Sequence, residues 1–366
     1  MPVEPLGRVR NVNSRLPKDR CPGVLRPYIA DDGAIMRLRK PGGQLSTSTL
    51  VALAELVTSY GAPAVHITSR GNIEARALPV PLPEPLVDAV TDLGLLPSLT
   101  HERVRNVFAN PLNPELTTLV AELDAAIIAD PALVELPGRF WFGFTDASGL
   151  GLTEPLDVAY QLLDDDSGRL LVAGRSLPVA KADAVAAMIA TAHTFLETRP
   201  AVDAWNMRDL PADSPVFVGM APAEIVPASP LTPGPIGDDL VVGLPLGDLT
   251  LDQARALAAV TDEIVVTPWR AVVVPNGAAH ADALAASGLV TSTESAWGRV
   301  SACAGAPFCR NTDRPTMQIA VDLVKVIDAD GPHVHLAGCE RHCGASDNEL
   351  ILYPDTLQDA LAQLTP

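Results

Sequence analysis

The chain has 366 residues, of which 48% are hydrophobic and 19% charged, and its formal net charge is −18. This length is enough for two or more domains with a sizeable core. The negative charge argues against nucleic acid as a partner, because phosphate binding requires a basic face. The longest apolar runs are short and interrupted, so we expect neither a membrane span nor a membrane partner.

The basic residues are uneven in kind, with 22 Arg against 4 Lys, and 12 of the Arg fall within the first 139 residues. Arginine binds carboxylates through a planar fork that lysine lacks. The concentration favours a pocket for a small polyanion, although ordinary surface pairing explains any single arginine more simply. The first 23 residues are charged and have no apolar core, so we expect no secretory signal and a cytoplasmic location.

The first predicted strand covers residues 34–39 and places Arg37 and Arg39 on one face, because side chains alternate along a strand. A Pro/Gly turn follows at residues 41–43. Beyond it, apolar residues at helical spacing predict a helix with one buried face, formed by Leu50, Leu53, Ala54 and Val57. The next predicted strand covers residues 65–68.

Another predicted strand covers residues 139–144. Phe140, Phe142 and Phe144 alternate onto one face and are most simply core residues. Arg139 and Trp141 fall on the other face, where we expect a cleft or solvent.

Residues 211–236 contain seven prolines and are expected to resist helix and sheet, so they are interpreted as a connector. They separate two similar segments, which begin at Lys40 and Leu244. A repeat of this length indicates duplication of one α+β unit. The matches are Pro41-Gly42-Gly43 with Pro245-Leu246-Gly247, Leu45-Ser46 with Leu249-Thr250, and Thr68-Ser69-Arg70 with Thr267-Pro268-Trp269-Arg270, the last with one insertion.

The second segment has its own helix and strand signals. Thr250 and Gln253 have the spacing of a capping box at a helix N-terminus. Residues 263–266 are the strand expected after that helix.

Four of the five cysteines form two close pairs, Cys303-x5-Cys309 and Cys339-x3-Cys343. A [4Fe–4S] cluster needs one thiolate for each iron, and one pair on each side supplies them. Structural zinc is the main competitor, but zinc pairs usually sit two to four residues apart, which the five-residue gap fits poorly. Metal ligation is therefore favoured over buried unligated cysteines, with iron–sulfur ahead of zinc.

Together these motifs resemble the sulfite/nitrite reductase superfamily, over about residues 21–343. The resembling elements are Arg37-Leu38-Arg39-Lys40-Pro41-Gly42-Gly43, Thr68-Ser69-Arg70, Arg105-Asn106-Val107 and the C-x5-C…C-x3-C pattern. The resemblance implies an α+β fold with two ferredoxin-like half repeats, two α/β lobes and pseudo-two-fold symmetry. The implied segments are 20–98 and 237–294 for the half repeats, 99–210 and a short 295–366 for the lobes, and 211–236 for the linker.

Within that superfamily the chain looks most like the precorrin-3B synthase branch, because it carries Thr267-Pro268-Trp269-Arg270 and ends 23 residues after Cys343. In addition, Trp141 stands where the reductases keep a lysine for sulfite or nitrite. An uncharged indole ring does not replace the ammonium group of lysine there, so anion reduction would lose a cationic donor. Glu340 and His342 depart from the small or Lys/Gly residues usual between the last two cysteines.

The resemblance implies a monooxygenase of aerobic cobalamin biosynthesis that takes precorrin-3A and O2, hydroxylates C20 and closes a γ-lactone. Its cofactors would be a [4Fe–4S] cluster on Cys303, Cys309, Cys339 and Cys343, and a non-haem iron whose ligands the sequence does not assign. Electrons would come from an external ferredoxin or NAD(P)H-dependent reductase, because no G-x-G-x-x-G follows a predicted strand. The implied substrate-binding residues are Arg37, Arg39, Arg70, Arg105, Arg139, Trp141 and Arg270.

Two other functions remain open. One is a sulfite or nitrite reductase that uses sirohaem with the cluster, and the other is a zinc-stabilised binding module without catalysis. Two further features carry weaker signals. Cys21 stands alone and is more simply structural than catalytic, and His333 with His335 is more simply a strand pair than a ligand set.

Overall fold

The computed structural model describes residues 19–345 and 349–364. They form two compact units. The first comprises residues 19–23, 39–42 and 97–230, and the second comprises 24–38, 43–96 and the described residues from 231 onward. Within the described residues, no helix is long and apolar enough to cross a membrane.

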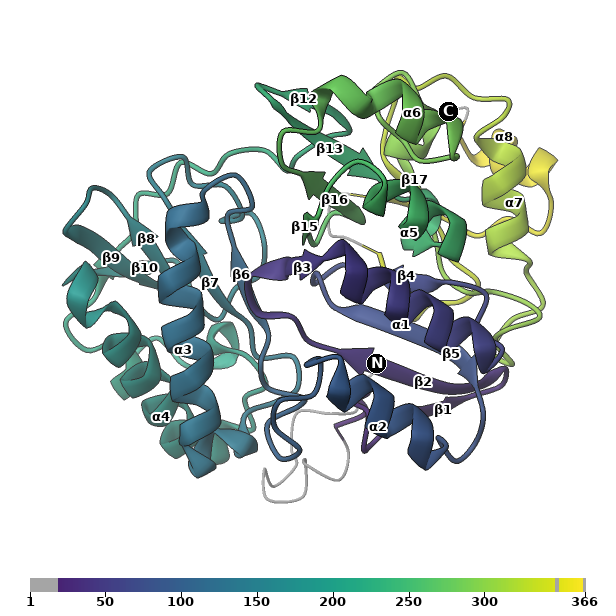
Figure 1. Ribbon diagram of the computed structural model, residues 1–366. Coiled ribbons are helices and arrows are strands. Elements are labelled where there is room, and N and C mark those ends of the chain that lie inside the picture. The colour runs from purple at the N-terminus through teal and green to yellow at the C-terminus, as the bar shows by residue number, and fades with distance from the viewer. Residues whose placement is uncertain (1–18, 346–348, 365–366) are drawn as a thin grey trace, which may run out of the picture. The chain divides into compact units, whose positions relative to one another are not determined.

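The second unit contains two five-stranded antiparallel sheets built from the two repeats (Figure 1). One sheet has the order β1 (Tyr28–Ala30), β2 (Gly33–Leu38), β5 (Ile73–Leu78), β4 (Val65–Ile67), β14 (Asp248–Leu249). The other has the order β12 (Gly234–Ile236), β13 (Asp239–Gly243), β16 (Ala271–Val274), β15 (Glu263–Val266), β3 (Gln44–Ser46). The last strand of each sheet comes from the other repeat, so the repeats exchange one strand each.

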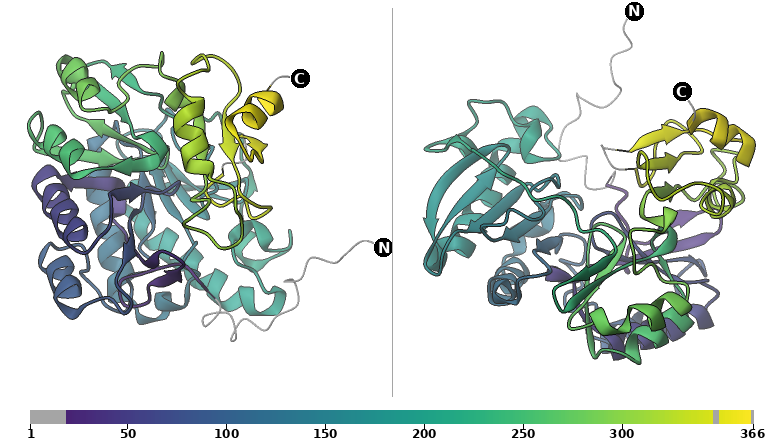
Figure 2. Two further views of the ribbon diagram at one scale, coloured as in Figure 1. Left: turned by 90° about the vertical axis from the view of Figure 1, so that its right-hand side faces the viewer. Right: turned by 90° about the horizontal axis from the view of Figure 1, so that it is seen from above.

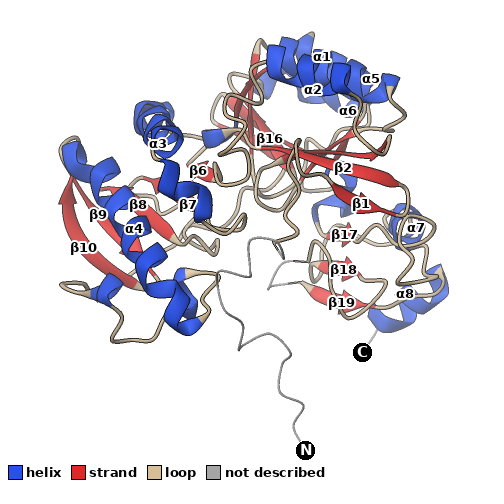
Figure 3. Ribbon diagram, turned by 90° about the horizontal axis from the view of Figure 1, so that it is seen from below, coloured by secondary structure: helices blue, strands red, loops and turns tan. Residues whose placement is uncertain are grey.

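Helices α1 (Thr47–Ser59), α2 (Glu84–Asp92), α5 (Leu251–Ala258) and α6 (Ala281–Ala286) cover one side of these sheets (Figure 3). Helices α1 and α5 pack against each other. The apolar face predicted for α1 is confirmed, since Leu50, Leu53, Ala54 and Val57 are all buried. The capping box of α5 is also confirmed, because Thr250 accepts from the Gln253 N–H and the Gln253 side chain accepts from the Thr250 N–H.

The Pro-Gly-Gly and Pro-Leu-Gly turns both end in a glycine that steric constraints require. Gly43 has φ of 79°, and a Cβ added there would lie 2.2 Å from the carbonyl oxygen of Val266. Gly247 has φ of 82°, and its Cβ would lie 2.7 Å from the carbonyl oxygen of Ile67. Both positions therefore need glycine for conformation and for close approach to the other repeat.

The turns before β5 and β16 have the same length, so the insertion expected between Thr68-Ser69-Arg70 and its repeat is wrong. Ile67 pairs with Ile73 and Val266 with Val272, six residues apart in each repeat. The Thr68 N–H donates to the Asn72 carbonyl at 2.9 Å, and the Thr267 N–H donates to the Ala271 carbonyl at 3.0 Å. Arg270 thus corresponds to Gly71, whereas the sequence match had paired it with Arg70.

The first unit is a six-stranded mixed sheet with α3 (Thr117–Ala129) and α4 (Ala184–Val202) packed on it and on each other. Strands β6, β7 and β8 run parallel, and β8 to β11 are antiparallel. The order is β11 (Ala221–Pro222), β10 (Arg175–Ala180), β9 (Ser167–Val172), β8 (Val158–Leu162), β7 (Phe142–Thr145), β6 (Val107–Ala109).

The strand predicted over 139–144 begins later, at Phe142. Phe140, Phe142 and Phe144 are buried as predicted, but Trp141 is buried too, at 1% exposure. The backbone of Trp141 is held inside the unit, because its carbonyl accepts from the N–H groups of Asp157 and Val158 at the start of β8 and its own N–H donates to the buried Asp157 carboxylate. Trp141 therefore does not face solvent, whereas Arg139 is exposed.

The proline-rich segment contains more β structure than expected. Residues of β11 pair with β10 in the first unit, and residues of β12 pair with β13 in the second. Both are edge strands, where proline is tolerated because its missing N–H can face away from the sheet. The expectation that residues 211–236 resist sheet is therefore wrong at these two places.

The C-terminal part of the second unit is a parallel three-stranded sheet, β17 (Val300–Ala302), β18 (Val334–Leu336) and β19 (Leu350–Leu352) (Figure 2). Helices α7 (Thr316–Leu323) and α8 (Leu357–Leu364) pack on each other, and the sheet and helices share one small apolar core. The connection β17–α7–β18–β19 resembles β6–α3–β7–β8 of the first unit, in keeping with the predicted pseudo-symmetry of the lobes.

Candidate iron–sulfur site

All four paired cysteines lie in loops that leave the C-terminal sheet. Cys303 directly follows β17, and Cys309 lies in the loop that leads to α7. Cys339 and Cys343 lie in the loop after β18. Because neighbouring parallel strands end at the same edge of a sheet, these two loops leave the sheet side by side.

The thiol of Cys343 interacts electrostatically with the other three thiols. Burial raises the pKa of the Cys343 thiol, and the charges of Cys303, Cys339 and Cys309 raise it further. Four adjacent thiolates repel one another, so a bound cation is needed to hold all of them deprotonated. Binding of a metal cluster would therefore release protons.

Hydrogen bonds reach two of the sulfur atoms. The Gly338 N–H donates to Cys303 Sγ at 3.1 Å, and Asn311 Nδ2 donates to Cys309 Sγ at 3.5 Å. The Thr316 hydroxyl donates to the Cys303 carbonyl at 2.7 Å. Hydrogen bonds to sulfur are among the terms that set the potential of an iron–sulfur cluster.

The donor set fits a four-cysteine cluster. All four thiols are free of disulfides and converge from two loops, and their neighbours donate hydrogen bonds to sulfur. Within residues 19–345 and 349–364, no three Cys, His, Asp or Glu side chains lie close enough to hold a single metal ion. The fit therefore rests on the number, type and placement of the thiols.

The loop that carries Cys309 docks on the turn between β1 and β2. The backbone N–H of Arg310 donates to Asp31 at 2.6 Å, and its guanidinium pairs with the same carboxylate. These contacts lower the pKa of Asp31. Arg76 pairs with Asp32 at 2.7 Å, and its guanidinium lies 5.9 Å from the ring centroid of Phe308. The first repeat thus supports the first cysteine loop.

The loop that carries Cys339 borders a surface pocket of about 680 Å³. Arg314 lines this pocket, donates to the Gly338 carbonyl at 3.1 Å and pairs with Asp355 at 2.9 Å. His342 hydrogen-bonds to the Tyr353 hydroxyl. The pocket is lined by Asn311, Thr312, Asp313, Arg314, Gly338, Cys339, Glu340, Tyr353 and Asp355.

The two histidines of β18 and its approach differ in environment. His333 is exposed, whereas His335 is completely buried, with Nδ1 2.7 Å from the Ser301 hydroxyl. Burial lowers the pKa of His335 to about 4, although the Glu349 carboxylate opposes that effect. The imidazole is therefore neutral near pH 7. His335 is thus a core residue and His333 a surface residue, which are the two roles expected from the sequence.

The arginines named from sequence divide between the two units. Arg37, Arg70 and Arg270 belong to the second unit. Arg37 pairs with its cross-strand neighbour Glu74, with Nε 2.6 Å from the carboxylate. This ion pair lowers the pKa of Glu74 against the raising effect of burial. Arg70 lies half-buried in the turn after β4, where its backbone N–H donates to the Thr68 hydroxyl at 3.3 Å.

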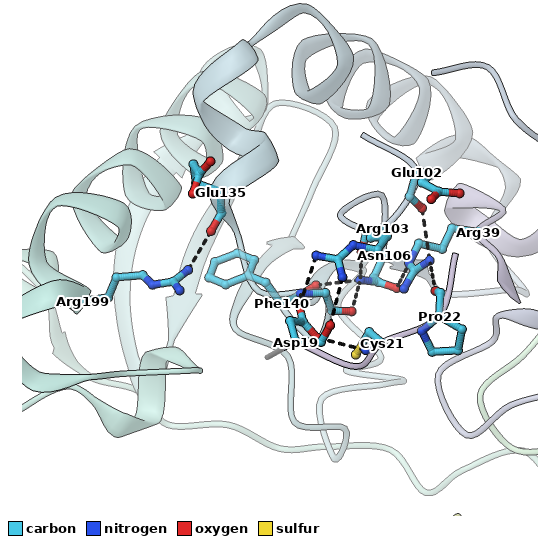
Figure 4. A network of polar contacts seen from close by, with 11 residues as sticks. Asp19, Cys21, Pro22, Arg39, Glu102, Arg103, Asn106, Glu135, Phe140 and Arg199 are labelled. Carbon is cyan, nitrogen blue, oxygen red and sulfur yellow. Dashed lines mark hydrogen bonds and ion pairs between the residues drawn. The ribbon is translucent and has the colours of Figure 1, made fainter. Parts of the chain in front are cut away.

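Arg39 belongs to the first unit and lies in a buried polar network (Figure 4). Its Nε donates to Asn106 Oδ1 at 2.9 Å, and its Nη1 donates to the carbonyls of Pro22 and Glu102 at 3.1 Å each. Asn106 Nδ2 donates in turn to the carbonyls of Gly138 and Phe140, at 3.1 Å each. This arrangement ties four separate chain segments together.

Arg105 and Arg139, also in the first unit, differ in exposure. Arg105 is buried and makes a bidentate pair with Asp124, with both distances 2.7 Å. Arg139 is exposed. The convergence of Arg37, Arg39, Arg70, Arg105 and Arg139 on one cleft remains a prediction.

Cys21 has a structural environment beside the same network. Its N–H donates to Asp19 at 3.0 Å, and a Cβ added at Gly138 would come within 2.8 Å of its own Cβ. Asp19 also accepts from the Gly138 N–H at 2.7 Å, and its carboxylate lies 3.6 Å from Arg103. Burial raises the pKa of Asp19, but these hydrogen bonds and Arg103 lower it by more.

The sequence analysis missed the polar residues that hold these arginines and loops. Asn106, Asp19, Ser301 and Glu349 were not singled out. Only Asn106 could have been predicted from the sequence, because it belongs to the Arg105-Asn106-Val107 motif. In that motif a role was assigned to the arginine alone. Ser301 and Glu349 lack any local signal, since they lie 48 residues apart. Asp19 has one local partner, Cys21, but its other partners Gly138 and Arg103 are far away in sequence.

Asp157 gives the first unit a testable pH dependence. It is 2% exposed and accepts from the N–H groups of Trp141 at 2.9 Å and Met207 at 2.8 Å. Burial raises its pKa from 3.8 to about 6 despite these hydrogen bonds. Between those values the folded state holds more protons than the unfolded state, so stability falls as pH rises from about 4 to about 6.

We expect Asp157→Asn to remove this pH dependence. Over the whole titration of Asp157 the free energy of unfolding changes by roughly 3 kcal/mol. Urea denaturation at pH 4.5 and pH 7 should show about 2 kcal/mol of this difference in wild type, because the rest lies below pH 4.5, and none of it in the variant. His335 acts in the opposite direction, because its neutral folded form is disfavoured at low pH, so only the difference between the two proteins is informative. Equal pH slopes in wild type and variant would contradict the assignment.

Comparisons with known proteins agree with this architecture. The family described as nitrite/sulfite reductase ferredoxin-like half domain matches residues 29–80. The Mycobacterium tuberculosis NirA protein is similar in structure, with a TM-score of 0.64, 18% identity, and coverage of 85% of this chain and 69% of that chain. A Sinorhizobium protein named precorrin-3B synthase is 25% identical over 368 residues, which cover 88% of this chain and 77% of that protein. The predicted resemblance is thereby confirmed: the chain has an α+β fold similar to that of the NirA protein, matches the nitrite/sulfite reductase half domain over residues 29–80, and is similar to a precorrin-3B synthase.

Proposed function

We propose that this chain is an oxygen-dependent monooxygenase that converts precorrin-3A to precorrin-3B. The observation that carries the proposal is the convergence of four free cysteine thiols from two loops of a chain similar to precorrin-3B synthase. Cys303, Cys309, Cys339 and Cys343 would hold a [4Fe–4S] cluster, one thiolate to each iron.

The bound cluster would supply electrons one at a time. The residues around it would hold the thiolates in place, through the Gly338 N–H and Thr316 on Cys303 and through Asn311 on Cys309. In the overall reaction one oxygen atom of O2 enters the substrate at C20 and the other leaves as water. That balance needs two electrons and two protons, and an external ferredoxin or NAD(P)H-dependent reductase would provide the electrons.

The substrate carries many carboxylates, so its binding residues would be arginines. Arg37, Arg39, Arg70, Arg105 and Arg139 are the candidates, whereas Trp141 is buried and is no longer proposed to contact the macrocycle. Arg139 is the first to test, because it is exposed while Arg39 and Arg105 are buried among internal partners. One charge-assisted contact contributes about 1.5–3 kcal/mol. Arg139→Ala should therefore weaken binding by roughly tenfold or more.

The test begins with protein purified without oxygen and analysed for iron, acid-labile sulfide and visible absorption. We expect about equal iron and sulfide, without the strong bands of sirohaem. The reduced protein is then given precorrin-3A with O2, or sulfite or nitrite with a chemical donor. Turnover of precorrin-3A with negligible sulfite or nitrite reduction is the expected result.

Two outcomes would overturn the proposal. Bound sirohaem with rapid six-electron reduction of sulfite would identify a sulfite reductase, and zinc without iron or sulfide would identify a zinc-stabilised module. Arg255→Ala is the matched control for Arg139→Ala, because Arg255 is also exposed and pairs with Glu55 on α1. Equal substrate affinity in the two variants would remove Arg139 from the binding site.

A further inference from the structure

Arg270 has a backbone conformation that arginine rarely adopts. Its φ is 51°, in the left-handed region, and its counterpart in the first repeat is Gly71, with φ of 65°. A left-handed conformation costs a residue with a Cβ about 1–2 kcal/mol, which glycine avoids. An arginine kept at such a position points to a role for its side chain.

The side chain of Arg270 extends to the loop that follows Cys343. Its Nη2 donates to the Gly344 carbonyl, and its Nη1 lies 3.7 Å from Glu349 Oε1. The two side chains are 17% and 10% exposed. Burial lowers the pKa of Arg270 and the Glu349 carboxylate opposes this, but a guanidinium stays protonated at any ordinary pH.

Glu349 is itself held by the strands of the C-terminal sheet. Its Oε1 accepts from the Ser301 hydroxyl at 2.6 Å, and that hydroxyl lies 2.7 Å from His335 Nδ1. Ser301 and His335 are directly paired residues of β17 and β18, and both are buried. Arg270 is thus connected through a buried polar network to the two strands that lead into the cysteine loops.

We propose that Arg270 is a positioning residue for the cysteine loop, holding the Gly344 carbonyl and with it the neighbouring Cys343. This inference rests on the proposed cluster and replaces the role in substrate binding expected from the sequence. Each repeat then supports one cysteine loop, since Asp31 of the first repeat pairs with Arg310 and Arg76 lies near the ring of Phe308 in the loop of Cys309. A buried cation beside a negatively charged cluster also raises its reduction potential, because net charge and hydrogen bonding set that potential.

Arg270→Gly is the most informative variant, because it removes the guanidinium and relaxes the backbone to the conformation of Gly71. We expect an unchanged or raised unfolding midpoint, with amide exchange of residues 339–345 at least tenfold faster than in wild type. We also expect a more negative reduction potential of the bound cluster in redox titrations followed by electron paramagnetic resonance. Arg270→Lys keeps the charge but not the planar fork, so exchange should rise while the potential stays closer to that of wild type.

Arg255→Ala is the control, because Arg255 lies on α5 and pairs with Glu55 at the surface. Unchanged exchange and potential in Arg270→Gly would overturn the proposal. A lowered unfolding midpoint with uniformly faster exchange would also overturn it, in favour of a general structural role. If wild-type protein contains neither iron nor sulfide, the proposed cluster fails. The exchange comparison then still tests the hold of Arg270 on the loop in the metal-free protein.

Discussion

Replacement of Cys303 by serine is expected to remove most of the iron and acid-labile sulfide from the purified protein. Cys303 directly follows β17, accepts the Gly338 N–H at 3.1 Å, and has its carbonyl fixed by Thr316. It is thus the cysteine whose position is most firmly defined by the strands. Serine is a poor substitute, because the thiolate is the ligand and an alcohol does not ionise near neutral pH.

Loss of the cluster should also destabilise the C-terminal sheet. A ligand that binds only the folded state at 100 times its Kd adds about 2.7 kcal/mol to stability. The sheet of β17, β18 and β19 shares one small core with α7 and α8, so it has little other support. We expect faster amide exchange in these elements than in the two antiparallel sheets.

Cys21→Ser is the matched control, since Cys21 belongs to the first unit and its backbone bonds Asp19. Iron and sulfide per chain, measured together with the visible spectrum, should match wild type in this variant. Full retention of iron and sulfide by Cys303→Ser would contradict the cluster assignment.

The sequence predicted the elements of the two repeats well, because their signals are local. The apolar spacing of α1 and the capping box of Thr250 and Gln253 depend on residues within one helical turn. The exchange of β3 and β14 between the sheets was not predictable in this way. The same alternating pattern pairs equally well with either neighbour, and only tertiary packing selects the partner.

The turn at Arg270 shows that sequence matching can also misplace a single residue. Matching arginine to arginine required an insertion, but the strand pairs Ile67–Ile73 and Val266–Val272 leave no room for one. Residue identity was a poor guide there, because the turn conserves backbone geometry and lets glycine and arginine occupy equivalent positions. The role inferred for Arg270 changed once its backbone was known.

Among the candidate site residues, the cysteines were predictable and their polar supports were not. Four thiols in two close pairs carry a chemical signal in the sequence itself. Ser301 and Glu349 lie 48 residues apart, and Arg39 and Asn106 lie 67 apart. No periodicity or spacing rule links residues at such separations, so only the folded chain identifies them as partners.

Asn106 has the largest predicted effect on the first unit, although the sequence singled out only its neighbour Arg105. It is 1% exposed, its Oδ1 accepts from Arg39 Nε, and its Nδ2 donates to the carbonyls of Gly138 and Phe140. Alanine at this position would leave a buried guanidinium and two buried carbonyls each short of one partner. An unsatisfied buried polar group costs about 1–3 kcal/mol, and more when it is charged.

Asn106→Ala should therefore lower the free energy of unfolding by about 3–5 kcal/mol, measured by urea denaturation. Asn113→Ala is the matched control, because Asn113 is half-buried, bonds Asp146 and caps a short 3-10 helix. Loss of such a cap costs about 1 kcal/mol. Equal destabilisation by the two variants would show that the network around Arg39 is not decisive for folding. If Asn106→Ala is the less stable protein as expected, the hydrogen-bonded pair of Arg39 and Asn106 is a structural part of the first unit.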